Sequence, residues 1–131
     1  MFVADTHIII WDALKPEKLS VMAREALDMA DQSGGIVFCD ISFWEIAMLI
    51  AKNRVEIGVS YLDFIELVLT ARNFTVQPIT PQIADIVTSL AEEISSDPAD
   101  RLIAATALDR GIPLITADTN LVESNVIQTV W

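Results

Sequence analysis

Short apolar runs alternate along this chain with longer segments in which apolar residues recur at helical spacing. The runs predict strands at residues 2–4, 36–39, 74–76, 114–115 and 126–130. The longer segments predict helices from residue 5 to about residue 14 and at residues 19–30, 42–51, 60–72, 80–94 and 98–110. The strand segments are apolar without alternating, so each predicted strand is expected to be buried on both faces.

Turn and capping residues divide these segments. The residues at 33–35, Ser-Gly-Gly, end one predicted helix. Thr80-Pro81 and Asp97-Pro98 each open another, and Gly111 closes the last long one. This order of strands and helices is typical of a parallel sheet covered by helices on both faces. We therefore predict a single three-layer α/β/α domain spanning residues 1–131.

Acidic side chains follow several of the predicted strands. Asp5 follows the first strand, residues 40–45 follow the second, and Asp118 follows the fourth. Asp97 and Asp100 lie at the start of the helix that leads into the fourth strand. In open α/β sheets, ligands bind outside the carboxyl ends of the strands, so these positions are the first place to expect a functional site.

Each of the main acids also has a structural explanation that weighs about as much. Asp5 and Asp118 can cap the helices that follow them. Ser42 and Glu45 have the spacing of a capping box, in which the glutamate bonds back to the serine amide. Asp100 falls in the first turn of a helix, where a carboxylate interacts favourably with the helix dipole. Local pattern alone leaves both explanations open.

The acids together are harder to explain as caps. Clustered carboxylates repel and raise one another's pKa unless something neutralises them. No lysine occurs after Lys52, and Arg101 is the arginine beside Asp100. Mg²⁺ and Mn²⁺ prefer oxygen ligands, so a divalent cation is the natural partner. We interpret Asp97 as the N-cap of its helix and Asp40 as a turn residue, outside the ligand set.

Composition limits the alternatives. At 53% hydrophobic residues the chain can bury a full core, and one cysteine, Cys39, supports neither an intramolecular disulfide nor a cysteine-based zinc site. The first residues lack the basic region of a signal peptide, and no apolar stretch has the length of a membrane span, so we expect a cytoplasmic protein. The net charge of −11 disfavours capture of nucleic acid unless bound cations or a basic partner reverse the local sign.

Four segments resemble, in order, the motifs of PIN-domain ribonucleases, and specifically the VapC-like toxins of bacterial toxin–antitoxin pairs. VADTHIIIW is similar to the first motif, with Asp5 as its acid, and SFWEIAML is similar to the second, with Glu45. DPADRLIAATAL resembles the third motif, with Asp100, and LITADTNL resembles the fourth, with Asp118. The similarity covers nearly the whole chain.

This resemblance implies an endoribonuclease that depends on Mg²⁺ or Mn²⁺, with Asp5, Glu45, Asp100 and Asp118 as catalytic metal ligands. It also implies a cognate antitoxin, a homodimer, an RNA substrate and water as the nucleophile.

Positions around the four acids support or modify the resemblance. Thr6 and Thr116 match hydroxyl positions beside the acids and are expected to support them. Ser95 stands where many relatives have a histidine, and Asn120 stands where some have a further acid. Both departures bear on the affinity for metal and leave the four main acids intact.

Other residues carry weaker functional interpretations. His7 is a conceivable catalytic base, but a structural role is favoured. Trp11 and Trp44 are interpreted as core or interface residues rather than as platforms for stacking bases. Lys52 and Arg54 can contact RNA phosphates, and a solvated loop pair is an equal alternative.

Two other classes of protein remain as alternatives. A receiver-like signalling domain would need an aspartate after the middle strand and a lysine near the last one, and neither is present. A PIN-like fold that binds without cutting has the same sequence pattern, and only substitution of the acids separates it from a nuclease.

Overall fold

Five parallel strands form the central layer of the computed structural model, which describes residues 1–131. The strands are β1 (Phe2–Ala4), β2 (Ile36–Cys39), β3 (Phe74–Gln77), β4 (Leu114–Ile115) and β5 (Thr129–Val130). Their spatial order is β3-β2-β1-β4-β5, and every neighbouring pair is parallel. The first strand therefore lies in the middle of the sheet, with β2 and β4 on its two sides.

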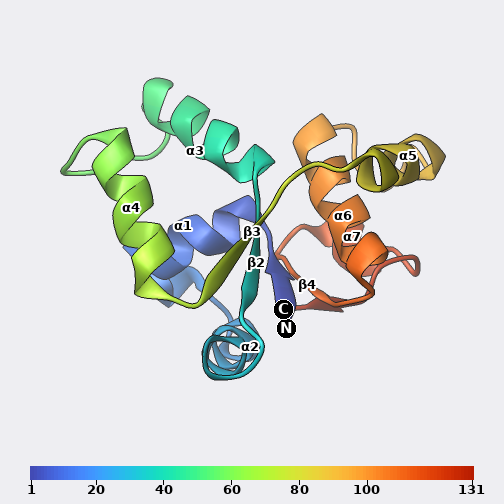
Figure 1. The fold of residues 1–131 in the computed structure, drawn as a ribbon, viewed down its shortest axis with the longest axis horizontal. Helices are drawn as coiled ribbons and strands as arrows, with labels where there is room; N and C mark the ends of the chain where they lie inside the picture. Colours follow the sequence, from blue (N-terminus) through green and yellow to red (C-terminus); the bar gives the residue numbers. More distant parts are fainter.

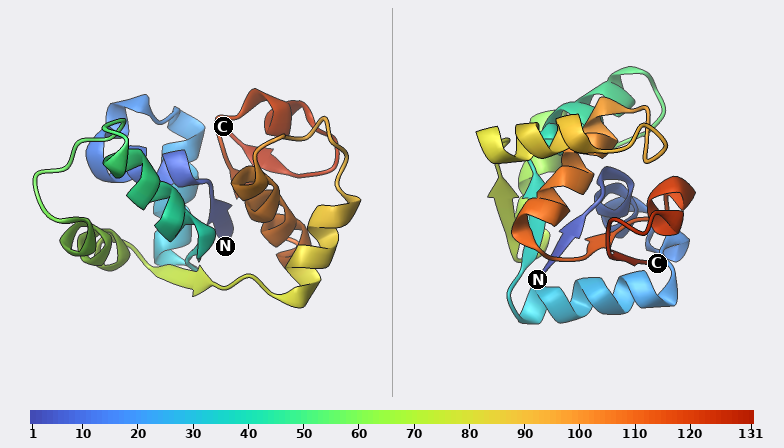
Figure 2. Two further views of the ribbon diagram at one scale, coloured as in Figure 1. Left: turned by 90° about the horizontal axis from the view of Figure 1, so that it is seen from above. Right: turned by 90° about the vertical axis from the view of Figure 1, so that its right-hand side faces the viewer.

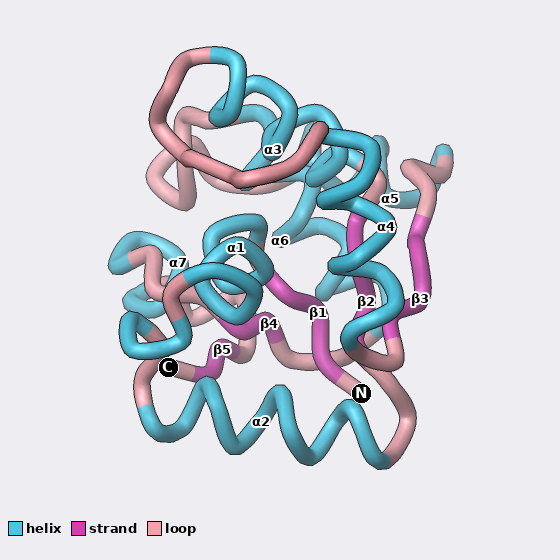
Figure 3. Tube along the Cα trace, turned by 90° about the vertical axis from the view of Figure 1, so that its left-hand side faces the viewer, coloured by secondary structure: helices cyan, strands magenta, loops and turns pink.

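Helices cover both faces of this sheet, which confirms the three-layer α/β/α prediction (Figures 1 and 2). On one side lie α1 (Thr6–Leu14), α3 (Ile41–Ala51) and α4 (Tyr61–Ala71). On the other lie α5 (Pro81–Ser89), α6 (Pro98–Arg110) and α7 (Thr119–Glu123). The helix α2 (Val21–Gln32) follows a short 3₁₀ turn, η1 (Pro16–Lys18), and crosses below the sheet (Figure 3).

The strands divide their side chains between two hydrophobic cores. Ile36 and Phe38 of β2 pack with α1, α2, α3 and α4, whereas Val37 and Cys39 pack with α5 and α6. Successive side chains of a strand point to opposite faces, so β1, β2 and β4 contribute to both cores. Burial on both faces explains why these three segments are apolar throughout. The expectation of burial on both faces is wrong for β3, an edge strand in which Thr75 and Val76 are exposed. Cys39 is buried and burial raises its pKa to about 12, which fits the inert thiol expected from the sequence.

The predicted helix over residues 80–94 is too long, because α5 ends at Ser89. Leu90 takes an extended conformation, and the guanidinium of Arg101 donates hydrogen bonds to the carbonyl oxygens of Val87 and Leu90 at 3.0 and 2.8 Å. Those bonds satisfy carbonyl groups that a helix end leaves without partners. Ile94 lies in the following turn and is still buried in the core. A contact with α6 therefore ends this helix.

The chain after β4 also differs from the prediction. Residues 119–123 form α7, and the last strand is confined to Thr129–Val130 instead of residues 126–130. The end of α6 follows the prediction, since Gly111 takes a left-handed conformation with φ of 63°. None of the helices is both long and apolar enough to cross a membrane.

Candidate metal centre

Five carboxylates from four parts of the chain converge above the central strands; together they are the acid cluster. They are Asp5, Glu45, Asp97, Asp100 and Asp118. Strand pairing explains part of this arrangement, because the backbone N–H of Asp5 donates to the carbonyl oxygen of Ile115 at 3.0 Å. The end of β1 is thereby held level with the end of β4. The helices α3, α6 and α7 supply the other four acids at or near their first turns.

Glu45, Asp97 and Asp100 form the tightest part of the acid cluster. Each offers a carboxylate oxygen, and these oxygens lie within 4.8 Å of one another. Asp97 is the N-cap of α6 as predicted, since its Oδ1 accepts from the N–H groups of Ala99 at 2.8 Å and Asp100 at 3.4 Å. The sequence interpretation gave Asp97 this role alone and missed that it also belongs to the group. The spacing of three residues between Asp97 and Asp100 was the available signal, because it places both on one face of a helix.

Asp5 is the most deeply buried acid of the cluster, with 6% of its surface exposed. Its Oδ1 accepts from the N–H of Thr6, and its Oδ2 accepts from the Thr116 hydroxyl, both at 2.8 Å. Burial raises the pKa of Asp5, and the two hydrogen bonds oppose that rise. Asp5 thus caps α1, as the capping explanation predicted. It also lies beside the other acids, as a metal-binding role requires.

The capping box expected at Ser42 and Glu45 is wrong. The helix α3 begins one residue earlier, and its N-cap, Asp40, makes no side-chain capping bond. Ser42 is fully buried with its hydroxyl 2.8 Å from the Thr6 hydroxyl, which in turn donates to Oε1 of Glu45. A hydroxyl carries one proton, so Thr6 donates to Glu45 and accepts from Ser42. Glu45 is held by a neighbouring helix instead of capping its own.

Ser95 and Thr116 hold two other acids by the same arrangement. The Ser95 hydroxyl donates to Oδ2 of Asp100 at 3.3 Å and accepts from the N–H of Asp97 at 3.1 Å. The Thr116 hydroxyl donates to Asp5 and accepts from the N–H of Asp118 at 3.1 Å. In each case one hydroxyl links a carboxylate of the cluster to the backbone of a helix N-cap. The N-cap is Asp97 of α6 for Ser95 and Asp118 of α7 for Thr116. Ser95, noted as a departure from relatives, therefore acts on the cluster directly.

Asp118 caps α7, with its Oδ1 accepting from the N–H groups of Asn120 at 2.9 Å and Leu121 at 3.3 Å. The short helical turn considered in the sequence analysis is therefore present. Asn120 is exposed, and its backbone N–H is the group that takes part in these bonds. No hydrogen bond joins the Asn120 side chain to an acid, and its role in offering an oxygen or orienting a water stays a prediction.

No lysine or arginine forms an ion pair with the acid cluster. Burial, followed by the charges of Asp5, Asp97 and the other two acids, raises the pKa of Asp100 to about 7. Burial also raises the pKa of Glu45. Arg101 adjoins Asp100 in sequence, but its guanidinium donates to four backbone carbonyl groups instead. The three ion pairs of the structure all involve Arg72, outside the cluster.

Such a donor set fits a hard divalent cation. All its ligand atoms are carboxylate oxygens, three of them already close together, and no lysine or arginine pairs with them. The hydroxyl groups of Thr6, Thr116 and Ser95 each donate to one carboxylate oxygen, which fixes the carboxylate and leaves other lone pairs available. The arrangement is suited to binding a cation and, through it, a phosphate group.

The chain is also similar to known proteins. The family model described as PIN domain matches residues 2–125. The chain is 32% identical over 117 residues to Ribonuclease VapC22 from Mycobacterium tuberculosis (strain ATCC 25618 / H37Rv), a match that covers 89% of this chain and 86% of that protein.

Solved structures are similar in fold. One is the crystal structure of VapBC2 from Rickettsia felis bound to a DNA fragment from their promoter, with a TM-score of 0.75 and 14% identity, covering 98% of this chain and 96% of that one. Another is DNA-bound VapBC from Salmonella typhimurium, with a TM-score of 0.70 and 18% identity, covering 98% and 95%.

Proposed function

The chain belongs to the PIN-domain family, and on that premise we propose that it is a metal-dependent endoribonuclease, the toxin of a VapBC-type toxin–antitoxin pair. Residues 1–131 act in it as one PIN-like domain. The observation that carries the proposal is the acid cluster, whose carboxylates lie together and form no ion pair with a lysine or arginine. The similarity to a ribonuclease supports the same activity.

Asp5, Glu45, Asp100 and Asp118 hold the cation in this proposal, and Mg²⁺ or Mn²⁺ is the ion because every ligand is an oxygen. When bound, the cation supplies electrostatic stabilisation of the charge that develops on the phosphate of the RNA. Asp97 is a further candidate ligand, since its carboxylate is within reach of Glu45 and Asp100.

The chain's own contribution is to hold the carboxylates in place. The Thr116 hydroxyl donates a hydrogen bond to Oδ2 of Asp5, and the Thr6 hydroxyl donates one to Oε1 of Glu45. Ser42 is fully buried and holds Thr6 in turn. Because these side chains are fixed by buried partners, the ligand oxygens lose little conformational freedom when a cation binds.

RNA cleavage with and without metal tests this function. We expect the wild-type chain to cleave total cellular RNA in the presence of Mg²⁺ or Mn²⁺ and to lose that activity in EDTA. The Asp100→Asn and Asp5→Asn variants should lose about a hundredfold or more of the activity, since even indirect partners of a metal site are worth about 10- to 100-fold. Gel analysis of the RNA over time measures each rate.

Asp63→Asn is the matched control, because Asp63 also lies in the first turn of a helix and is outside the cluster. It should cleave like the wild type. Cleavage that survives EDTA, or full activity in Asp100→Asn, would overturn the proposal. If Mn²⁺ binds by calorimetry but no RNA is cut, the chain is the non-cutting binder considered above. The receiver-like alternative is excluded by the family.

The partners in this proposal are the RNA substrate, an antitoxin and a second copy of the chain. An apolar groove of about 360 Å³, lined by residues including Leu14, Ile57 and Phe64, supports a protein partner. Leu67, which lines this groove, is 60% exposed, and Leu62 of the same helix is 76% exposed. Apolar surface of this kind is usually covered by another protein. The site of action is the cytoplasm, where RNA and antitoxin are both present.

Light scattering after size exclusion tests the oligomer, and co-expression tests the antitoxin. A monomer at all concentrations would contradict the homodimer. Leu62→Glu combined with Leu67→Glu should weaken binding of the protein encoded by the adjacent reading frame, while the cleavage rate of the free chain stays the same. Unchanged binding of that protein would remove the groove from the proposal.

A further inference from the structure

Three side chains surround the ring of Trp11 in helix α1: those of His7, Lys18 and Trp131. The ring of His7 lies 6.0 Å from that of Trp11, measured between centroids, and Trp11 lies 6.0 Å from the ring of Trp131. The ammonium group of Lys18 sits 5.8 Å from the centroid of Trp11. We call these four residues the aromatic strip. The strip joins the first helix to the last residue of the chain.

The strip begins near the acid cluster. Asp5 caps α1, and His7 is the second residue of the same helix, in its first turn. Trp11 is four residues further along, on the same face of the helix. The strip therefore continues the candidate metal centre outward along the surface.

The strip is accessible to a ligand. His7 and Lys18 are exposed, and Trp131 keeps 37% of its surface exposed. Trp11 is partly buried and packs against the first core, so the core role expected for it is correct for one side of the ring. Trp44, the other tryptophan, is 58% exposed on α3 and has no aromatic neighbour. Trp11 and Trp131 are therefore the two tryptophans whose rings lie next to each other.

Positive charge lies beside Trp11, at the centre of the strip. Arg72, Arg101 and Arg110 are bound to acids, carbonyl groups or Gln77. Lys15 and Lys18, by contrast, make no ion pair and are exposed. Of the two, Lys18 lies beside an aromatic ring, in a chain whose net charge is −11. This combination is what proteins use to bind single-stranded nucleic acid.

We propose that the aromatic strip binds unpaired bases of the RNA strand next to the phosphate that is cut. The proposal rests on the proposed ribonuclease function and names how the substrate is held. Bases stack on Trp11 and Trp131, and His7 contacts the nucleotide nearest the acid cluster. Lys15 and Lys18 contact phosphates further along the strand. Recognition of this kind favours single strands and tolerates different bases.

Tryptophan fluorescence tests the proposal without cleavage. The Trp44→Phe variant leaves Trp11 and Trp131 as its only tryptophans. Titrated with polyadenylate in EDTA, it should show quenching, and the duplex of polyadenylate with polyuridylate should quench far less. Trp11→Ala and Trp131→Ala should each weaken binding of polyadenylate about tenfold, in the range of base–aromatic stacking. Trp44→Phe should bind as tightly as the wild type.

Two exposed positions guard against simple loss of folding. His7→Gln and Lys18→Gln lie outside the core and should fold normally by circular dichroism. Lys18→Gln should weaken binding severalfold and reduce the dependence of log K on log salt by about 0.7, the value for one phosphate contact on a single strand. In Mg²⁺, the strip variants should raise the KM for RNA more than they lower kcat.

Several outcomes would overturn the strip as an RNA site. The first is absence of polyadenylate binding by the wild type. The second is binding by Trp11→Ala and Trp131→Ala as tight as that of the wild type. The third is quenching by the duplex equal to quenching by polyadenylate alone. Loss of antitoxin binding with an unchanged Kd for polyadenylate would assign the strip to the protein partner instead. Failure of the ribonuclease function is seen separately, as absence of RNA cleavage by the wild type in Mg²⁺.

Discussion

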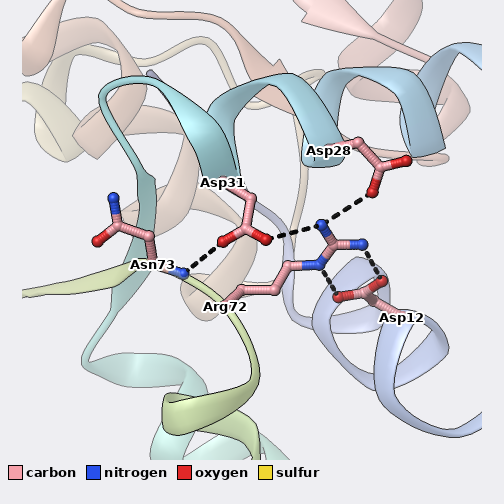
Figure 4. A network of polar contacts seen from close by, with 5 residues as sticks. All are labelled: Asp12, Asp28, Asp31, Arg72 and Asn73. Carbon is pink, nitrogen blue, oxygen red and sulfur yellow. Dashed lines mark hydrogen bonds and ion pairs between the residues drawn. The ribbon is translucent and has the colours of Figure 1, made fainter.

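Two regions of the molecule gather acidic side chains, and they differ in what neutralises them. In the first, Arg72 contacts Asp12, Asp28 and Asp31 (Figure 4). Its guanidinium donates to both oxygens of Asp12 at 2.7 and 2.9 Å and to Asp28 at 3.0 Å. In the second, the acid cluster, carboxylates lie together with no arginine or lysine among them.

The difference separates a structural site from a functional one. The acids around Arg72 raise the pKa of that arginine, chiefly through the Asp12 hydrogen bonds, so these acids have a cationic partner within the chain. That network ties the end of α4 to α1 and α2. In the acid cluster, burial and repulsion raise the pKa of Asp100, so the folded chain pays for holding it. A bound cation offsets that cost, which is why the second region implies a ligand and the first does not.

Arg72→Ala is expected to have the largest effect on stability. It leaves Asp12 half-buried without its bidentate partner, which should lower the free energy of unfolding by about 3 kcal/mol. Chemical denaturation measures the loss. Arg54→Ala is the control, since Arg54 is exposed and makes no ion pair, and it should change stability little. Equal stability of both variants would show that the Arg72 network does not hold the helices together.

Added Mn²⁺ should have the next largest effect on stability. This effect should depend on the acid cluster and not on the Arg72 network. Ligand that binds only the folded state at a hundred times its Kd stabilises by about 2.7 kcal/mol. We expect this rise in the wild type and in Arg72→Ala, but not in Asp5→Asn. Thermal unfolding with and without Mn²⁺ measures it. A rise in Asp5→Asn equal to that of the wild type would mean that the ion binds elsewhere.

The contrast between the two regions also shows what sequence can reveal about the fold. Strand positions and the parallel sheet were predictable, because apolar runs without alternation require burial on both faces. The end of α5 was not, because it depends on Arg101, which comes from the next helix. Periodicity continued through Ile94, which is buried whether or not it is helical.

The site could be predicted in position but only partly in detail. Asp5 and Asp118 follow strands in a parallel sheet, so topology places them at one edge. The role of Glu45 was misread locally, because its partner Thr6 is 39 residues away and competes with the Ser42 amide. Asp97 matched a helix cap so well that a second role was not sought. Contacts between distant segments decide these details.

Ser95→Ala should have a smaller effect, confined to metal binding. Loss of the hydroxyl frees Asp100 to rotate and removes a partner of the Asp97 N–H, which should weaken Mn²⁺ binding about tenfold. Calorimetry measures the Kd. Ser96→Ala is the matched control, because Ser96 is adjacent and exposed. Weakening by both variants would point to the loop as a whole, and no weakening by either would show that Ser95 does not hold Asp100.

The smallest expected effect is the pH dependence of the metal-free protein. The ordinary pKa of the Asp100 carboxyl is 3.8, and in the folded chain it is about 7. Between these values the folded state holds a proton that the unfolded state has released, so stability falls as pH rises from 4 to 7. Asp100→Asn removes this group and should flatten the curve, making the variant more stable than the wild type at pH 7 by less than about 1 kcal/mol after solvent screening.

This last effect distinguishes the two regions most directly, because removing an acid has opposite consequences in them. Asp12→Asn should destabilise the protein at pH 7, since it weakens the Arg72 pair, whereas Asp100→Asn should stabilise it. Denaturation in EDTA at pH 5 and pH 7 measures both. If Asp100→Asn were destabilising at pH 7 without metal, the carboxylate would be stabilised by a cationic group of the chain, and the acid cluster would be a structural site like the one around Arg72.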